Sequence, residues 1–229
     1  MESCLFTAAV ILAAGSGTRM GCRTAKQELC LLGDSLLRHT LRAFEASVVD
    51  AIVVVVRADE LPFAEHEIRG FAKVKSIVVG GADRRESAAR GFAAIPHESR
   101  LVAIHDAARP LITPRDINAT VALAAMCGAA VPVSEVTDTV KSVREDGEIS
   151  GTPDRSALRL AATPQVFRTD WYAEAMTVGG ERSVTDDSML LELAGIPVRT
   201  VLLQDENRKI TTPRDLDYAE YILERRKRT

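Results

Sequence analysis

The residues best suited to chemistry in this chain lie in a loop near its beginning. The apolar run 9–14 ends in two alanines and is followed by Gly15, Gly17 and Arg19, with Lys26 a few positions later. Glycines allow backbone N–H groups to approach an anion without a Cβ in the way. The two cations can neutralise phosphate charge. The pattern therefore predicts a buried strand that opens into a phosphate-binding loop.

Two familiar nucleotide loops do not fit this segment. A P-loop needs a Lys-Ser/Thr pair after its second glycine, and this chain has none there. The dinucleotide fingerprint needs a third glycine where this chain has Met20, and an acidic residue after the next strand, where it has Arg57. An NADP-dependent oxidoreductase is therefore only a distant alternative. We expect a nucleotide loop in which Arg19 and Lys26 act on the phosphates.

Two further charged segments follow apolar runs, at residues 80–84 and 105–110. The carboxyl ends of parallel strands meet at one edge of a sheet, where ligands bind, so we expect both segments to lie beside the first loop. Asp106 ends an apolar run, and this position favours a Mg²⁺ ligand over a simple helix cap. Ser87, in the first turn of the next helix, either contacts a base or ribose or only begins that helix.

Other charged residues are ambiguous from the sequence. Arg84 and Arg85 fit a site or a surface equally well. His105 has no second His or Cys at ligand spacing, which favours a packed or hydrogen-bonded role over a metal ligand. Lys209 lies in a charged loop that would ordinarily be solvated. The basic run at 224–228 is expected to be a solvated helix end, because cations favour a helix C-terminus.

The elements that must position these residues alternate along the chain. Apolar runs predict strands at 8–13, 51–57, 74–79, 101–105, 128–132, 160–166 and 197–203. Amphipathic stretches predict helices at 35–46, 62–71, 85–94, 114–127, 169–176, 185–194 and 213–226. This alternation predicts an α/β fold with a mostly parallel sheet and helices on both faces.

Segments 137–143 and 148–152 alternate polar and apolar residues around the turn Glu145-Asp146-Gly147, which predicts a β-hairpin. We expect it to project as an arm at about 136–156 from a single domain spanning 1–229. A two-stranded ribbon is marginal alone, so packing against a second subunit is a natural way to stabilise it.

The composition argues against a nucleic-acid-binding protein and a membrane protein. The chain has 229 residues, a net charge of −3 and 46% hydrophobic residues, so nucleic-acid binding by bulk charge is not expected. The four cysteines show no pairing pattern, and the sequence has no signal peptide. No apolar run reaches the ~20 residues that a membrane span needs. We expect a cytoplasmic protein with no membrane partner.

Taken together, the segments LAAGSGTRM, AKQ, GGADRRES, IHDAARP, TDTVKSV, ATPQVF, VTDDSMLLE and NRKIT, in this order, resemble the 2-C-methyl-D-erythritol 4-phosphate cytidylyltransferase family. The resemblance covers essentially the whole chain. It implies a Rossmann-like homodimer in which a protruding β-arm completes the partner's site. It also implies that CTP and methylerythritol phosphate react with Mg²⁺, releasing pyrophosphate, in the non-mevalonate isoprenoid pathway.

The resemblance implies roles for individual positions. The residues expected to act on the phosphates are Arg19, Lys26 and Lys209. The residues expected around the nucleotide are Ala13, Ala14, Gly15, Gly17, Gly81, Asp83, Ser87 and Ala107. Asp106 is expected to bind Mg²⁺. The second substrate is expected to contact Arg109, Thr139, Arg155 and Thr163, with Thr139 and Arg155 supplied by the other subunit's arm.

The sequence leaves two other functions open. A ribitol 5-phosphate cytidylyltransferase would share the loop and the lysines, although the run 107–109 and the segment around Arg155 favour methylerythritol phosphate. A catalytically silent nucleotide-binding regulator would not need Lys26, Asp106 and Lys209 together.

Overall fold

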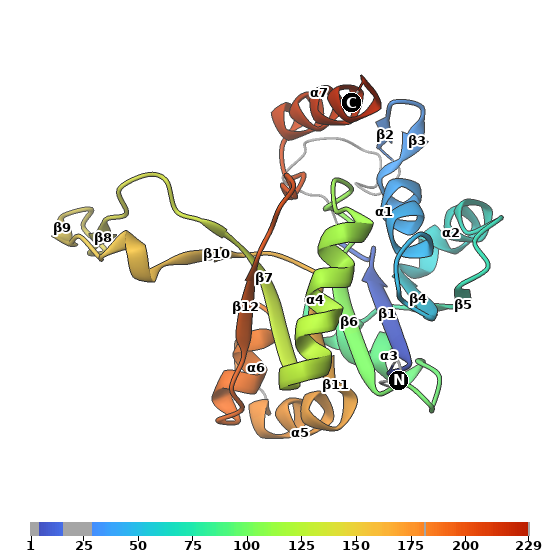
Figure 1. Cartoon of the computed structure of the whole chain (residues 1–229), viewed down its shortest axis with the longest axis horizontal. Coiled ribbons are helices and arrows are strands. Elements are labelled where there is room, and N and C mark those ends of the chain that lie inside the picture. The colour runs from blue at the N-terminus through green and yellow to red at the C-terminus, as the bar shows by residue number, and fades with distance from the viewer. Residues whose placement is uncertain (1–4, 16–28, 181, 229) are drawn as a thin grey trace.

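The computed structural model describes residues 5–15, 29–180 and 182–228 of the chain. In these ranges eight strands form one sheet (Figure 1), in the order β10-β7-β11-β6-β1-β4-β5, with β12 also paired to β7. The strands are β1 Thr7–Leu12, β4 Ala51–Val56, β5 Val74–Val79, β6 Leu101–Asp106, β7 Ala129–Glu135, β10 Arg159–Ala161, β11 Gln165–Arg168 and β12 Arg199–Leu202. The predicted α/β architecture is confirmed.

The centre of the sheet is the parallel set β6-β1-β4-β5. Strands β1, β4 and β6 are buried along their whole length. Parallel strands covered by helices on both faces read as continuous apolar runs, which is why these three were recognisable in the sequence. The carboxyl ends of β1 and β6 lie side by side, with Leu12 opposite Asp106.

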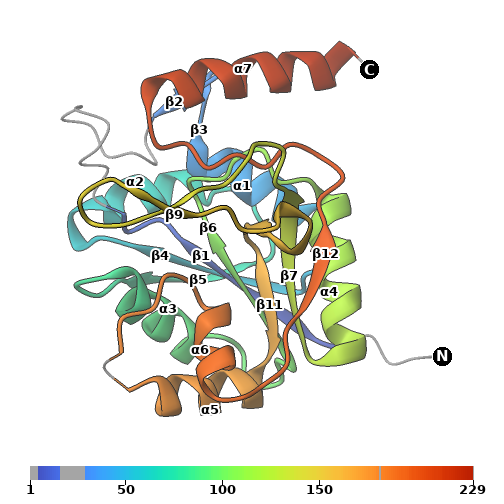
Figure 2. The same cartoon turned by 90° about the vertical axis from the view of Figure 1, so that its left-hand side faces the viewer.

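Helices cover both faces of this sheet, as expected. On one face α1 (Leu36–Glu45), α2 (Leu61–Glu67) and α4 (Pro114–Cys127) pack on a cluster that includes Ala9 and Ile11 of β1. On the other face α3 (Arg84–Ala93), α5 (Thr169–Gly179) and α6 (Ser188–Leu193) pack on Val10 and Leu12 (Figure 2). Successive side chains of a strand point to opposite faces, so one short run supplies both cores.

Three helices start at side-chain caps that fix their boundaries. The Ser35 hydroxyl accepts from the backbone N–H of Arg38, and the Asp83 carboxylate accepts from that of Glu86. Thr113 caps α4 in the same way and is followed by a proline at the first helical position. The buried face of α1 consists of the apolar residues that the sequence predicted, among them Leu37, Leu41 and Phe44.

One predicted element is wrong. Residues 160–166 do not form a single strand but two, β10 and β11, separated by Ala162, Thr163 and Pro164. Both segments run antiparallel to β7, which they meet near its two ends. Strand β11 also pairs antiparallel with β6, so the sheet is mixed on this side. The interruption places Thr163 beside the end of β6.

The chain beyond β12 forms a small third core. Helix α7 (Pro213–Arg228) packs against the hairpin β2 (Cys30–Leu31) and β3 (Asp34–Ser35), which was not predicted. Leu31, Ile210 and Ala219 are fully buried in this cluster. The two-residue strands carry too little periodicity to be recognised from sequence. This core holds α7 above the carboxyl edge of the sheet (Figures 1 and 2).

The arm is an extension of the sheet. Its stalk is the antiparallel pair of β7 and β10, and its tip is the hairpin β8 (Ser142–Val143) and β9 (Ile149–Gly151), followed by a 3₁₀ turn at Arg155–Ala157. It extends sideways from the body in Figure 1. The paired segments are shorter than the 137–143 and 148–152 expected. Among the described residues, no helix is long and apolar enough to cross a membrane.

Candidate active site

The candidate site begins where β1 and β6 end together. The backbone N–H of Ala107 donates to the carbonyl of Leu12 at 2.9 Å, and that of Ala13 donates to Val55 at 2.7 Å. Ala13 and Ala107 are buried, Ala14 is half-buried and Gly15 is exposed. The predicted site residues Gly17, Arg19 and Lys26 lie outside the described residues. The strand ends thus place the first and third charged segments beside one another.

The second glycine segment adjoins the first. A Cβ built on Gly80 would lie 2.9 Å from the Cβ of Ala14 and 2.7 Å from the hydroxyl of Ser87. That hydroxyl accepts from the N–H of Gly81 at 3.0 Å and donates to the carbonyl of Asp83 at 2.7 Å. Ser87 therefore holds the turn that presents Gly81 and Asp83. Its contact with a base or ribose stays a prediction.

Asp106 is the centre of the site. Its Oδ1 accepts from Nε of Arg84 at 3.0 Å, and its Oδ2 accepts from Nζ of Lys209 at 2.6 Å. Burial alone would raise the pKa of this carboxyl, but the charges of Arg84 and Lys209 outweigh burial and hold the pKa well below its usual range. Asp106 is therefore ionised at neutral pH, and its carboxylate is contacted by two cations from distant segments of the chain.

Arg84 is held on its other side by a second carboxylate. Its Nη1 lies 2.7 Å from Oδ2 of Asp187, the residue that precedes α6. The hydroxyl of Tyr172 on α5 donates to Oδ1 of the same carboxylate at 2.7 Å. Burial lowers the pKa of Arg84, but Asp187 and Asp106 together raise it above its ordinary value. Asp187 and Tyr172 were not singled out from the sequence, because nothing in their spacing links them to residue 84.

Thr163 closes the site from the β10–β11 interruption. Its Oγ1 lies 3.2 Å from the backbone N–H of Asp106, from which it accepts, and 3.0 Å from Nδ1 of His105. Its carbonyl accepts from Nδ2 of Asn207 at 2.8 Å. Burial lowers the pKa of His105 to about 3, so the ring is neutral at physiological pH. His105 is thus a buried hydrogen-bonding partner, as its lone position in the sequence suggested.

The loop that carries Lys209 is anchored along its length. Asp116 on α4 accepts from the N–H groups of Gln204 and Asp205 at 2.9 and 3.3 Å. Nη1 of Arg109 donates to the carbonyl of Asn207 at 2.9 Å. The N–H of Ile210 donates to the carbonyl of Ala108 at 2.7 Å. A loop with its backbone bonded at this many points presents Lys209 in one place, which charge patterning alone could not predict.

One residue of the basic tail also anchors this loop. Arg226 donates from Nη2 to the carbonyl of Glu206 at 3.0 Å and from Nη1 to that of Leu111 at 2.7 Å. The prediction of a wholly solvated helix end is therefore wrong for Arg226, although its neighbours Arg225 and Lys227 are exposed. The contacts are made to backbone carbonyls distant in sequence, and no sequence pattern reports such contacts.

The sequence and the fold of this chain both match one family of known proteins. The family model described as IspD, 2-C-methyl-D-erythritol 4-phosphate cytidylyltransferase, matches residues 7–225. The chain belongs to this family. A cytidylyltransferase of that name from Pelotomaculum thermopropionicum is 43% identical, with 96% of this chain and 94% of the relative covered. One from Geobacter metallireducens is 44% identical, covering 94% of this chain and 96% of the relative.

Solved structures of the cytidylyltransferase family share the fold. The crystal structure of 4-diphosphocytidyl-2C-methyl-D-erythritol synthase from Anaerococcus prevotii superposes with a TM-score of 0.84 at 28% identity, covering 96% of each chain. The enzyme from Thermus thermophilus superposes with a TM-score of 0.77 at 30% identity, covering 94% of this chain and 98% of that one.

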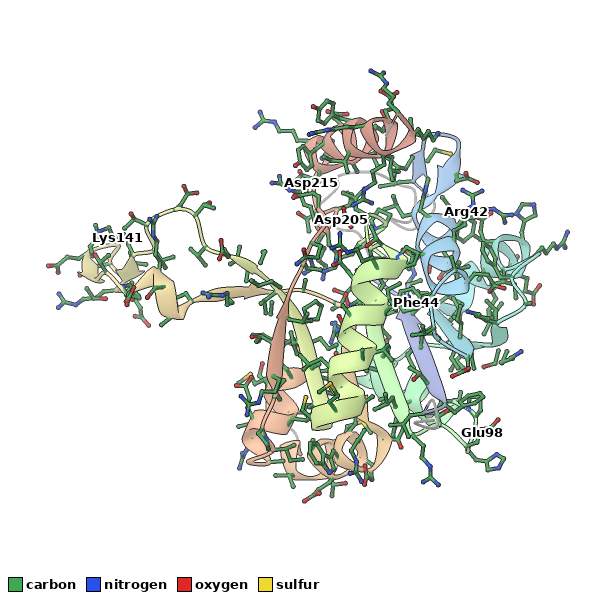
Figure 3. The ribbon with its side chains drawn as sticks, viewed as in Figure 1. Arg42, Phe44, Glu98, Lys141, Asp205 and Asp215 are labelled. Atoms are coloured by element: carbon green, nitrogen blue, oxygen red, sulfur yellow. The ribbon has the colours of Figure 1, made fainter. Side chains whose placement is uncertain are left out.

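Two of the site residues expected for this cytidylyltransferase lie on the arm, away from Asp106. Thr139 and Arg155 are both exposed, and Nη1 of Arg155 donates to the carbonyl of Thr137 at 2.6 Å. Figure 3 labels Lys141 on the arm and Asp205 on the anchored loop, and the two lie on separate parts of the molecule. Within one chain the structure therefore brings together Thr163, Arg109, Asp106 and Lys209, but not the arm residues.

The residues present fit a divalent cation bound together with phosphates. Within the described ranges, no group of three or more His, Cys, Asp or Glu side chains could hold a metal alone. Mg²⁺ usually takes only one or two carboxylates and completes its shell with water and phosphate oxygens. An ionised carboxylate offers about four acceptor positions, and Arg84 and Lys209 occupy two at Asp106. Asp106 thus has about two acceptor positions left for a metal ion.

Proposed function

We propose that this chain transfers the cytidylyl group of CTP to 2-C-methyl-D-erythritol 4-phosphate and releases pyrophosphate, in isoprenoid precursor synthesis. The observation that carries the proposal is the cluster of Arg84, Lys209 and Arg109 around the ionised Asp106, beside the two glycine segments. These cations lie at the sheet edge where α/β folds bind nucleotides, and we propose that they bind the phosphates. The names of the relatives supply the two substrates.

The proposed reaction needs positive charge around the phosphates, and the cations of this site supply it. A phosphate oxygen of methylerythritol phosphate attacks the α-phosphorus of CTP, and the bond from that phosphorus to the bridging β-phosphate oxygen breaks. The attacking oxygen is already anionic, so no general base is required. The barrier is repulsion between anions and the charge of the transition state, which positioned cations relieve. The buried, neutral His105 bonded to Thr163 is consistent with a site without a catalytic base.

Individual roles follow from this chemistry. Lys209 is proposed to contact the α-phosphate, since it lies at the edge of the cluster and its side chain is 38% exposed. Ala13, Ala14, Gly81 and Ala107 are proposed to line the space for the base and ribose. Arg109 and Thr163 are proposed to face the second substrate. The roles of Arg19 and Lys26 rest on the sequence pattern.

Mg²⁺ is proposed as the cofactor, with Asp106 as its protein ligand. The ion supplies positive charge to the phosphates and orients them. Arg84 and Lys209 keep the Asp106 carboxylate ionised and fixed, so that it is ready to bind without taking up a proton or changing direction.

We further propose a cytoplasmic homodimer in which the arm reaches the second subunit. Support comes from the arm itself, whose Val143 and Ile149 are 63% and 58% exposed in the single chain. An isolated ribbon with exposed apolar side chains is marginal, and a partner would bury them. This would bring Thr139 and Arg155 to the substrate of the other subunit.

The deciding experiment measures pyrophosphate release from CTP and Mg²⁺ with two acceptors, methylerythritol phosphate and ribitol 5-phosphate. Turnover with methylerythritol phosphate alone supports the proposal. Turnover with ribitol 5-phosphate alone keeps the mechanism and overturns the pathway. Absence of turnover with both, while CTP still binds, would instead identify a nucleotide-binding regulator.

A further inference from the structure

A chain of polar contacts runs from the interior of the protein to the candidate metal ligand. It passes from Tyr172 on α5 to Asp187 before α6, then to Arg84 at the start of α3 and finally to Asp106 at the end of β6. Tyr172 is 1% exposed and Asp187 is 2% exposed. Burying a carboxylate is costly unless it is paired, so this arrangement is a specific feature rather than an incidental surface contact.

The geometry at Arg84 shows what this chain does. A guanidinium facing a single carboxylate commonly donates two parallel N–H bonds to it. Here the contacts of Arg84 are divided instead, because Nε donates to Asp106 while Nη1 forms an ion pair with Asp187 at 2.7 Å. Asp106 therefore receives one N–H from Arg84, and its other oxygen receives the ammonium of Lys209. The division leaves acceptor positions of Asp106 open.

The two neighbouring acids before α6 have different partners. Asp186 accepts from Nε2 of Gln165 at 2.8 Å and from the N–H of Met189 at 3.1 Å. Its carboxylate therefore satisfies a backbone donor in the first turn of α6. Asp187 directs its carboxylate toward Arg84 and Tyr172. Burial and the adjacent Asp187 raise the pKa of Tyr172. Tyr172 consequently keeps its proton and remains a donor to Asp187.

We propose that Asp187 and Tyr172 are positioning residues that hold Arg84 across two carboxylates and thereby keep Asp106 open to a divalent cation. The inference rests on the proposed role of Asp106 in Mg²⁺ binding. Without the charge of Asp187, Arg84 turns both of its donors onto Asp106 and competes with the metal. Loss of the Asp187 charge is therefore expected to weaken metal binding specifically, whereas a general loss of packing would not act on metal binding alone.

The test measures metal affinity directly. Mn²⁺ binding to the protein with α,β-methylene-CTP is followed by electron paramagnetic resonance, and the Mg²⁺ dependence of kcat is measured alongside. Asp187→Asn is expected to raise the Mn²⁺ dissociation constant by about tenfold, the lower end of effects seen when the partner of a metal ligand is lost. Tyr172→Phe is expected to raise it by about threefold.

The matched control is Arg85→Lys. Arg85 is the next residue of α3, and among the described residues its guanidinium donates to the carbonyls of Arg182 and Met176 alone. It is expected to leave the dissociation constant within twofold of the wild type. In an Arg84→Lys background, Asp187→Asn is expected to add nothing, because Asp187 acts through the shared guanidinium. An additional tenfold effect in that background would overturn the proposal.

The remaining outcomes separate this inference from the proposed function. If folded Asp187→Asn and Tyr172→Phe proteins both bind Mn²⁺ like the wild type, the positioning role is wrong. If Asp187→Asn does not fold, Tyr172→Phe decides. If the wild type binds Mn²⁺ and the CTP analogue but releases no pyrophosphate from CTP with methylerythritol phosphate, the proposed function fails while the Mn²⁺ ratios still decide the role of Asp187. Absence of Mn²⁺ binding by the wild type overturns the inference.

Discussion

Replacing Lys209 by methionine removes one cation from the site and keeps the length of the side chain. Two unit charges about 4 Å apart interact by about 4 kcal/mol at an effective dielectric constant of 20. Lys209 shares its charge with Asp106 at 2.6 Å and is 38% exposed, so part of this energy is screened. A remainder of about 3 kcal/mol corresponds to a loss in kcat of roughly 10²-fold, within the range of 10²–10³ found for a single electrostatic stabiliser.

The assay is steady-state pyrophosphate release at saturating CTP, methylerythritol phosphate and Mg²⁺. Arg208→Met is the matched control, because Arg208 is the adjacent cation on the same loop. Its guanidinium lies 4.5 Å from the centre of the Tyr218 ring and 3.9 Å from Asp215, on the outside of the cluster. We expect Arg208→Met to change kcat by less than threefold. A loss under threefold at Lys209, or equal losses at the two positions, would refute the assigned role.

Three further results are expected. Arg226→Met should lower kcat by about tenfold, because a charged donor to Leu111 and Glu206 contributes about 1.5–3 kcal/mol to holding the Lys209 loop, whereas Arg228→Met on the exposed end of α7 should have no effect. Gly80→Ala should raise the KM for CTP by about tenfold, because its Cβ would crowd Ala14 and Ser87 at an overpacking cost of about 1–3 kcal/mol, and CTP titrations would measure the shift. His105 has a folded pKa of about 3 against 6.5 unfolded, so its contribution to stability is present above pH 6.5 and falls by about 3 kcal/mol toward pH 4. Urea unfolding of His105→Gln should show a shallower loss over that range, and an unchanged slope would contradict the assignment.

The parallel half of the fold could be predicted from the sequence because its signals are local. Apolar runs reveal the strands β1, β4 and β5, and amphipathic stretches with a period of about 3.6 residues reveal the helices α1 and α3. The break in the strand at Thr163 was missed, because the apolar pattern continues across it. The hairpin of β2 and β3 has strands of two residues each and no pattern to detect.

The part of the candidate site that lies at the carboxyl ends of the strands could be predicted from the sequence. Asp106 and the glycine segments could be placed together because parallel strands end at one edge. The link from Arg84 to Asp187 could not be inferred, since it joins two elements on one face of the sheet through side-chain geometry. Lys209 was identified as a site residue through the family resemblance. Its position could not be inferred from the sequence itself, because only the fold shows that its loop is bonded to α4, α7 and the segment after β6.

The contact of Asp106 with Lys209 joins residues that lie 103 positions apart in the chain. During synthesis the parallel strands that form the nucleotide side of the site leave the ribosome first, and β12, the Lys209 loop and α7 follow them. A nascent chain that has not yet reached residue 209 lacks the cation proposed to contact the α-phosphate. We therefore expect nucleotidyl transfer to require translation past this loop.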